Sequence, residues 1–221
     1  KYKAKKLKKR MSNNYLDLKQ INESKIKKDY FPFFTVKNSL LKNIDSNRLV
    51  SDFPDISEGG SFPIESDTGE EIKELIKELE GQEFKALLED KFEVELNNEP
   101  VVTTLRGYSR LKDGKIHTDS SSKIITVLLY LNQNWNENEG YLRLLKDNND
   151  LDNYIEEVPC TFGSMVAFKV TDNCWHGFKP YEGKRLSLQL NYISSQSHGL
   201  HAWRHRISAF FKKLKKILKP F

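Results

Sequence analysis

The sequence predicts an α+β protein in which a layer of helices supports an antiparallel double sheet of the jelly-roll or sandwich type. Apolar residues recur at helical spacing between residues 36 and 91, whereas residues 100–193 divide into short β-rich segments separated by Gly, Asn and Asp turns. None of these turns is long enough for the crossover helix that parallel strands require. A parallel α/β sheet is therefore excluded.

Three helices are predicted in the N-terminal half. The first covers residues 36–49, the second follows the acidic segment 67–71 and ends before Gly81, and the third covers residues 83–91. Residues 12–99 are therefore expected to form a mainly helical support region. The apolar positions that define these helices are Val36, Leu40, Leu41, Ile44, Leu49, Ile72, Leu75, Ile76, Leu79, Phe84, Leu87 and Leu88.

The second half of the chain, residues 100–193, is predicted to be the β core. Its apolar segments are short and rich in β-branched and aromatic residues, and turn residues separate them at close intervals. This pattern indicates a jelly roll or a sandwich. The predicted strands are 101–111, 116–119, 123–132, 141–145, 154–158, 164–170, 176–181 and 185–193.

Basic residues gather at the two ends of the chain. The 221 residues include 36 Lys and Arg against 31 Asp and Glu, which gives a formal net charge of +5 and a pI of about 9.0. Seven basic residues lie in residues 1–10 and seven in residues 198–221, and neither segment contains an acidic residue. The rest of the chain is acidic, so the pI describes the ends and not the body.

Both basic ends are predicted to lie outside the core. Residues 1–11 form a basic N-terminal extension, and residues 194–221 are predicted to form an amphipathic helix, because Trp, Phe, Ile and Leu recur there at spacings of three and four. That helix either packs on the domain with its lysines in solvent or lies on an anionic membrane surface through residues 198–221. Nucleic acid is the least favoured partner.

The sequence favours a cytoplasmic protein, with residues 198–221 as a means of peripheral attachment to the inner membrane surface. No stretch approaches the roughly 20 apolar residues of a membrane span, and no apolar segment follows the basic N-terminus as in a secretory signal. Cys160 and Cys174 are too few for a disulfide framework and lack the spacing of a zinc site. We expect both to be buried free thiols.

The histidines in the body of the chain indicate a metal site. Three of the five histidines lie in residues 198–221, which leaves His117 and His176. In a strand, residues two apart face the same way, so His117 and Asp119 can bind one metal together. If His176 comes from a neighbouring strand, the three residues supply two imidazoles and a carboxylate, as in non-haem Fe(II) oxygenases.

The last predicted strand carries polar residues on one face only. Between residues 185 and 191 the even-numbered residues are leucines, and the polar residues alternate with them. A polar face turned towards a barrel interior is costly unless the interior binds a ligand. Arg185 with the hydroxyl of Ser187 two residues later is suited to hold a ligand carboxylate. The polar residues are Arg185, Ser187, Gln189 and Asn191.

Together these motifs resemble those of a known family. The segments that carry the resemblance are Tyr108, His117-Thr118-Asp119, Thr126, Leu129-Tyr130-Leu131-Asn132, Gly140-Tyr141-Leu142-Arg143, Phe162-Gly163-Ser164, Val166-Ala167-Phe168, His176 and Arg185. With them, residues 100–193 resemble the Fe(II)/2-oxoglutarate-dependent dioxygenases of the prolyl 4-hydroxylase-like branch. The resemblance implies a double-stranded β-helix, which is a jelly roll, as the catalytic core.

The resemblance also implies a metal centre and a cosubstrate. Fe(II) would be bound by His117, Asp119 and His176, which would thus be both the metal ligands and the catalytic residues. The cosubstrates would be 2-oxoglutarate and O2, with ascorbate as an optional reductant. The distal carboxylate of 2-oxoglutarate would pair with Arg185.

Three further side chains fall where relatives contact the cosubstrate. By resemblance, Ser187 occupies the position of the Ser in an Arg-x-Ser pair, and Tyr108 and Tyr130 occupy positions of tyrosines directed towards 2-oxoglutarate. An inward-facing tyrosine on a strand is equally often a core residue. The tyrosine assignments therefore rest on the resemblance alone.

The implied reaction is hydroxylation of a substrate with formation of succinate and CO2. A carboxylate at Asp119 argues against halogenation, since halogenating relatives have a small residue there. The substrate would be peptidyl proline or a small molecule linked to the envelope or to saccharides. Two other functions remain open: a non-catalytic jelly-roll binding module tethered by its C-terminal helix, and a cupin-like metalloenzyme without 2-oxoglutarate, which leaves Arg185 and Ser187 unexplained.

Overall fold

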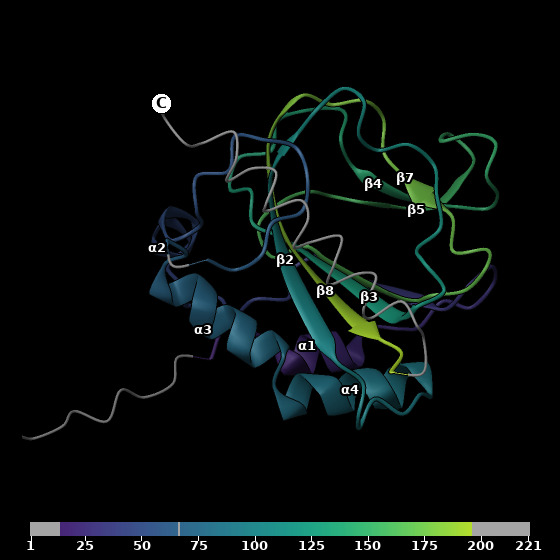
Figure 1. Cartoon of the computed structure of the whole chain (residues 1–221), viewed down its shortest axis with the longest axis horizontal. Helices are drawn as coiled ribbons and strands as arrows, with labels where there is room; N and C mark the ends of the chain where they lie inside the picture. The colour runs from purple at the N-terminus through teal and green to yellow at the C-terminus, as the bar shows by residue number, and fades with distance from the viewer. Residues whose placement is uncertain (1–13, 66, 196–221) are drawn as a thin grey trace, which may run out of the picture.

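A computed structural model describes residues 14–65 and 67–195 of the chain. Within them, two antiparallel sheets face each other (Figure 1): a five-stranded sheet in the order β1-β6-β3-β8-β2 and a three-stranded sheet in the order β5-β4-β7. This is the predicted jelly roll, a double-stranded β-helix. The strands are β1 (Phe33–Val36), β2 (Val101–Ser109), β3 (Lys123–Tyr130), β4 (Leu142–Leu145), β5 (Tyr154–Val158), β6 (Met165–Lys169), β7 (His176–Gly177) and β8 (Gly183–Ile193).

Helices cover the outer face of the five-stranded sheet (Figure 1). They are α1 (Leu18–Glu23), α2 (Ser46–Ser51), α3 (Glu70–Leu79) and α4 (Gln82–Phe92). The apolar stripe of α3 packs in one core cluster with Leu186, Leu188 and Leu190 of β8, which explains why both sets of positions are apolar. The helices predicted after the acidic segment 67–71 and over residues 83–91 are thus present as α3 and α4.

The opposite face of β8 looks into the space between the sheets. Its polar side chains are buried there, at 0% relative exposure for Ser187 and 6% for Arg185. A second apolar cluster, which includes Tyr130, Leu144 and Phe168, fills part of the same space. The inner face therefore consists of an apolar section and a buried polar section, and the polar section contains the candidate site.

The helix predicted over residues 36–49 is wrong. Residues Phe33–Val36 form the edge strand β1, which pairs with β6, and helix begins only at Ser46, where the side chain of Asp45 accepts a hydrogen bond from the amide of Arg48. The apolar residues at helical spacing belong to a strand, an isolated bridge at Leu40 and a short helix. Over so short a run, periodicity does not separate helix from strand.

Two of the predicted strands are much shorter than expected. Residues 116–119 form no strand, and His117 makes only an isolated bridge with His176. The strand predicted over residues 176–181 contains only His176 and Gly177, and Pro180 follows in a segment without ladder pairing. The two segments are joined to each other by the bridge between His117 and His176.

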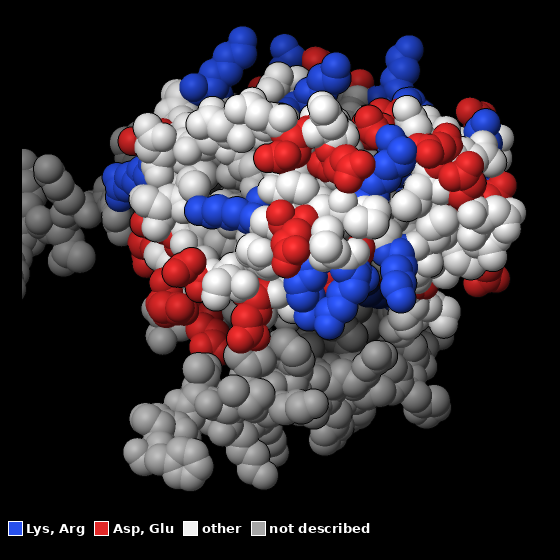
Figure 2. All heavy atoms as spheres, turned by 90° about the horizontal axis from the view of Figure 1, so that it is seen from above, with Lys and Arg blue, Asp and Glu red and all other residues white. Residues whose placement is uncertain are grey.

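The charged side chains on one face of the molecule can be followed in Figure 2. On the face shown in Figure 2, acidic and basic side chains are interspersed. Residues 1–13 and 196–221, which contain the expected basic extension and almost all of the expected amphipathic helix, lie outside the described residues. Among the helices that the structure does describe, none has the length and apolar character needed to cross a bilayer. Cys160 and Cys174 are buried free thiols, as predicted.

Candidate active site

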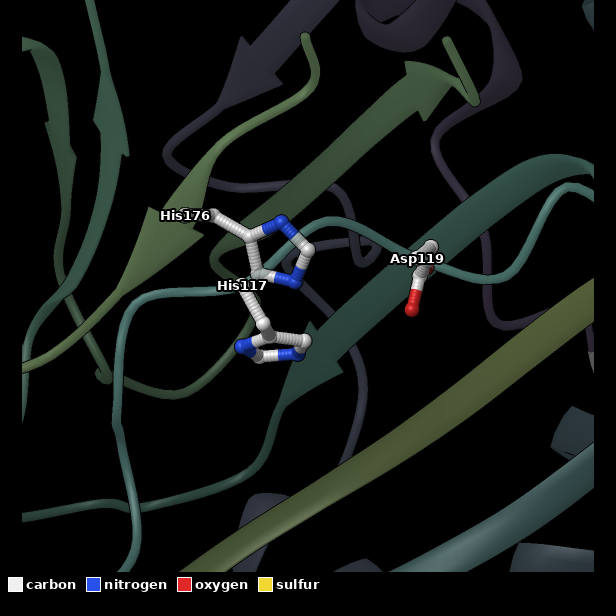
Figure 3. A group of neighbouring side chains, drawn as sticks. All are labelled: His117, Asp119 and His176. Atoms are coloured by element: carbon white, nitrogen blue, oxygen red, sulfur yellow. The ribbon is translucent and has the colours of Figure 1, made fainter. Parts of the chain in front are cut away.

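The structure brings His117, Asp119 and His176 together at the end of the barrel (Figure 3). One ligand atom from each side chain lies within 4.8 Å of the other two. His117 and His176 are held as neighbours by two backbone hydrogen bonds of 3.0 and 2.9 Å, and their ring centroids are 4.3 Å apart. His176 is buried and His117 is exposed, so the cluster lies at the mouth of the interior.

Both imidazoles are oriented by a backbone carbonyl two residues earlier. The Nδ1 of His117 lies 2.8 Å from the carbonyl oxygen of Lys115, and the Nδ1 of His176 lies 2.8 Å from that of Cys174. A carbonyl oxygen only accepts hydrogen bonds, so Nδ1 carries the proton in each ring. The Nε2 lone pairs are therefore free to bind a metal, in the arrangement typical of histidine ligands.

Asp119 is held by two side chains. Lys123 Nζ lies 2.8 Å from Oδ1, and the hydroxyl of Thr126 donates to Oδ2 and lies 3.0 Å from the side-chain amide of Asn191. Burial alone would raise the pKa of Asp119, but the charge of Lys123 and these hydrogen bonds outweigh it, so the pKa lies below its usual value. Asp119 is a fixed carboxylate, as a cation site requires.

His176 is neutral at physiological pH. Burial, followed by the proximity of His117, lowers the pKa of His176 to about 4. A neutral imidazole binds a metal without first losing a proton. Two imidazoles and one carboxylate are the donor set that Fe(II) accepts on one face, with the remaining positions left for other ligands, so the residues fit this metal.

Arg185 is buried next to the cluster and has no acidic partner among residues 14–65 and 67–195. Its Nε donates to the carbonyl oxygen of Gly140 at 3.0 Å, and Nη2 donates to the hydroxyl of Tyr130 at 3.1 Å. Its guanidinium carbon lies 4.2 Å from the ring centroid of Phe178. The guanidinium is thus fixed in orientation while part of its donor capacity stays free for an anion.

The hydroxyl of Tyr130 lies against the guanidinium of Arg185, and Ser187 follows Arg185 by two residues on the same face of β8. Burial raises the pKa of Tyr130 to about 12, against the opposing effect of Arg185, so the phenol keeps its proton and can donate it in a hydrogen bond. The hydroxyl of Ser187 is buried and has no hydrogen-bond partner among the described residues. A buried polar group without a partner is costly, which points to a ligand at this place.

Two adjoining cavities lie at the site and are lined by its histidines, Asp119 and Arg185. One, of about 100 Å³, is lined by the His117, Asp119 and His176 cluster together with Tyr130 and others. The second, of about 230 Å³, lies next to it and is lined by Tyr108 and residues of the following turn. The residues lining both cavities are Arg106, Phe178 and Arg185.

Tyr108 lines the second cavity and does not line the cavity of the histidine cluster. The reason is a β-bulge: Arg106 pairs with Ser187, whereas Tyr108 pairs with Lys184, so the register of β2 shifts between them. Its role towards a cosubstrate stays a prediction.

Sequence reasoning missed Arg106 and Lys123. Lys123 follows Asp119 by four residues, and Arg106 lies two residues before Tyr108 on β2. Residues two apart on a strand share a face, so the assignment of Tyr108 could have suggested Arg106 as well. The β-bulge between these two residues, which changes their register with β8, cannot be seen in the sequence.

The comparisons with known proteins agree with this geometry. Residues 104–193 match the family model of the 2OG-Fe(II) oxygenase superfamily. This segment is a 2OG-Fe(II) oxygenase domain. The predicted class of enzyme, a dioxygenase that uses Fe(II), 2-oxoglutarate and O2, is thereby confirmed. Among curated proteins, no sequence matches the chain.

Solved structures similar to the oxygenase include two prolyl hydroxylases. One is a prolyl hydroxylase from Trichoplax adhaerens, in complex with a hypoxia inducible factor oxygen degradation domain peptide fragment, at 17% identity over 83% of this chain and 90% of that chain, with a TM-score of 0.54. The other is a viral collagen prolyl hydroxylase from Paramecium Bursaria Chlorella virus-1, in a 2OG complex, at 12% identity over 73% and 96%, with a TM-score of 0.51. Identities this low show a shared fold.

Proposed function

We propose that this oxygenase is a hydroxylase in which His117, Asp119 and His176 bind Fe(II) and Arg185 binds the distal carboxylate of 2-oxoglutarate. The observation that carries the proposal is the convergence of two free imidazole nitrogens and a carboxylate within 4.8 Å, in a cavity that also contains Arg185. The first group offers unused imidazole nitrogens to a metal ion, and Arg185 has no acidic partner among the residues that the structure describes. Fe(II) is that metal ion in the proposal, and 2-oxoglutarate is that acidic partner.

The residues around the cofactors have distinct tasks in this proposal. Bound Fe(II) and 2-oxoglutarate supply the O2-dependent oxidation, with succinate and CO2 as coproducts and ascorbate as an optional reductant. Arg185 and the protonated hydroxyl of Tyr130 donate to the distal carboxylate, and Ser187 donates its unpartnered hydroxyl to the same group. Phe178 shields the charge pair from water, which strengthens it.

Hydroxylation is the outcome that Asp119 favours. Its carboxylate is fixed by Lys123 and Thr126 and is ionised, so it occupies one metal position with a permanent protein ligand. No position at that place is left for a halide. The substrate classes that we propose are peptidyl proline and a small molecule linked to the envelope or to saccharides; the fold that the chain shares with prolyl hydroxylases supports the first.

A spectroscopic titration tests the proposal. Under anaerobic conditions, the full chain with Fe(II) and 2-oxoglutarate is expected to develop the weak visible charge-transfer band of the chelate, because iron and the 2-oxoacid bind side by side. Succinate in place of 2-oxoglutarate is the control, since it has the distal carboxylate but no keto group, and it should give no band. If 2-oxoglutarate also gives no band, the chain is a non-catalytic module or a metalloprotein of another kind.

Replacement of Lys123 by methionine is expected to destabilise the metal-free protein by about 3 kcal/mol at pH 7, because it leaves Asp119 as a buried carboxylate without its cation. A divalent metal then supplies the missing charge, so Mn(II) should stabilise the Lys123→Met variant more than the wild type. Urea unfolding with and without Mn(II) measures both effects. The matched control is Lys184→Met, at an exposed position near the start of β8, and equal metal effects in all three proteins would contradict the expectation.

A further inference from the structure

Arg106 is a second arginine directed into the interior, and the proposed function gives it no task. It lies on β2 directly opposite Ser187 on β8 and lines both cavities. Its Nε is buried without a hydrogen-bond partner, and no ion pair joins it to an acidic residue within 14–65 and 67–195. A buried guanidinium nitrogen in this condition is costly unless an anion compensates it.

The other cationic side chains of the two cavities already have partners. Arg110 forms a two-point ion pair with Asp113, with distances of 3.1 and 2.9 Å, and Lys123 pairs with Asp119. Arg185 is held by Gly140 and Tyr130 and receives the distal carboxylate of 2-oxoglutarate in the proposed function. Burial, followed by the charge of Arg185, lowers the pKa of Arg106, so the positive charge of Arg106 is disfavoured where it lies. One anion cannot balance both.

We propose that Arg106 binds an anionic group, a carboxylate or a phosphate, on the substrate that the enzyme oxidises. The inference rests on the proposed function, because that function assigns Arg185 to 2-oxoglutarate, together with the cavity of about 100 Å³ lined by His117, Asp119 and His176, here called the triad cavity. The other carboxylate of 2-oxoglutarate belongs to the metal chelate, so the cosubstrate leaves no anionic group for Arg106. The group that Arg106 binds comes from a third molecule.

The cavity of about 230 Å³ is where this molecule is placed. Arg106 lies at its boundary with the triad cavity, so a substrate anchored on Arg106 extends towards the metal position. The buried hydroxyl of Ser109, which also lacks a hydrogen-bond partner among the described residues, lies in the same lining and can donate to the anion. Phe178 provides an apolar wall. The volume is below that of pockets for drug-sized ligands, so the site accepts a small acidic molecule or the acidic end of a larger one.

Paramagnetic relaxation tests the proposal without turnover. The full chain is loaded with Mn(II) in place of Fe(II) and with 2-oxoglutarate, and the nuclear relaxation of three added probes is measured: acetate, methylphosphonate and the neutral acetamide. An anion bound at Arg106 is close to the metal, so its relaxation is enhanced. The enhancement for at least one of the two anions should exceed that for acetamide about tenfold, the ratio expected for a hydrogen bond between charged groups.

Variants distinguish the role of Arg106 from that of the rest of the site. Arg106→Met should abolish the preference for the anion, and Arg106→Lys should retain part of it. Arg110→Met is the matched control, because Arg110 lines the same cavity but is already paired. The probe that responds identifies the group: acetate indicates a carboxylate and methylphosphonate a phosphate.

Three results would overturn the inference. These are an enhancement no larger for either anion than for acetamide in the wild type, an anion preference that survives in Arg106→Met, and a loss of 2-oxoglutarate binding in Arg106→Met, which would make Arg106 a cosubstrate contact. The relaxation of 2-oxoglutarate itself reports on the proposed function. If 2-oxoglutarate shows no enhancement in the wild type, the proposed function fails, and that outcome is visible separately from the behaviour of the anionic probes.

Discussion

Asp119→Ala is expected to lower the affinity for Fe(II) by more than about 100-fold and to abolish 2-oxoglutarate turnover. Removal of an outer partner of a metal ligand already costs 10–100-fold in affinity, and Asp119 is the only carboxylate in the cluster that the structure describes. Without it, His117 and His176 offer two neutral donors and no negative charge. The affinity is measured by metal titration under anaerobic conditions, and succinate formation measures turnover.

The interpretation of this variant requires a control for folding, because Asp119→Ala leaves Lys123 as a buried cation without its partner. The double variant Asp119→Ala/Lys123→Met removes that charge and should fold while still failing to bind iron. Asp113→Ala is the matched carboxylate control, since Asp113 lies in the neighbouring cavity and pairs with Arg110. Near-normal iron affinity in the folded double variant would remove Asp119 from the metal site.

Much of the site could be predicted because it depends on local pattern. The alternation of β8 places Arg185 and Ser187 on one face regardless of how the sheets pack, and both are buried on the inner face as expected. The structure places His117 and Asp119 in one cluster, as their spacing predicted, although residues 116–119 form no strand. The reason is that an extended segment held by the single bridge to His176 has the same period as a strand.

What could not be predicted depends on pairing between distant segments. Strand β1 exists because Phe33–Val36 pairs with β6, more than a hundred residues later, and a four-residue segment carries too little pattern to show this. Arg106 faces Ser187 only because of the register of β2 with β8, and a bulge next to it directs Tyr108 into the second cavity. Register and bulges are set by the packing of the sheet and cannot be seen in the sequence. Sequence reasoning therefore assigned Tyr108 to the cosubstrate and overlooked Arg106.

Arg185→Met is expected to weaken the binding of 2-oxoglutarate at least about 30-fold while Fe(II) affinity stays unchanged. Truncation of one member of a buried, hydrogen-bonded charge pair costs roughly 2–5 kcal/mol, and 2 kcal/mol is the lower limit of this range. In the wild type, the carbonyl oxygen of Gly140 and the hydroxyl of Tyr130 hold the guanidinium in orientation before the cosubstrate binds. Titration of the visible band with 2-oxoglutarate measures the effect.

Two further variants separate the loss of charge at Arg185 from the loss of its geometry. Arg185→Lys keeps a positive charge but lacks the planar fork, so it should recover only part of the affinity. Arg143→Met is the matched control, because Arg143 on β4 pairs with Glu157 and Asp152 and lines neither of the two cavities. Its affinity for 2-oxoglutarate should equal that of the wild type. If Arg185→Met binds 2-oxoglutarate as the wild type does, the distal carboxylate lies elsewhere, and Arg106, the other arginine that lines the triad cavity, becomes the residue to test for that role.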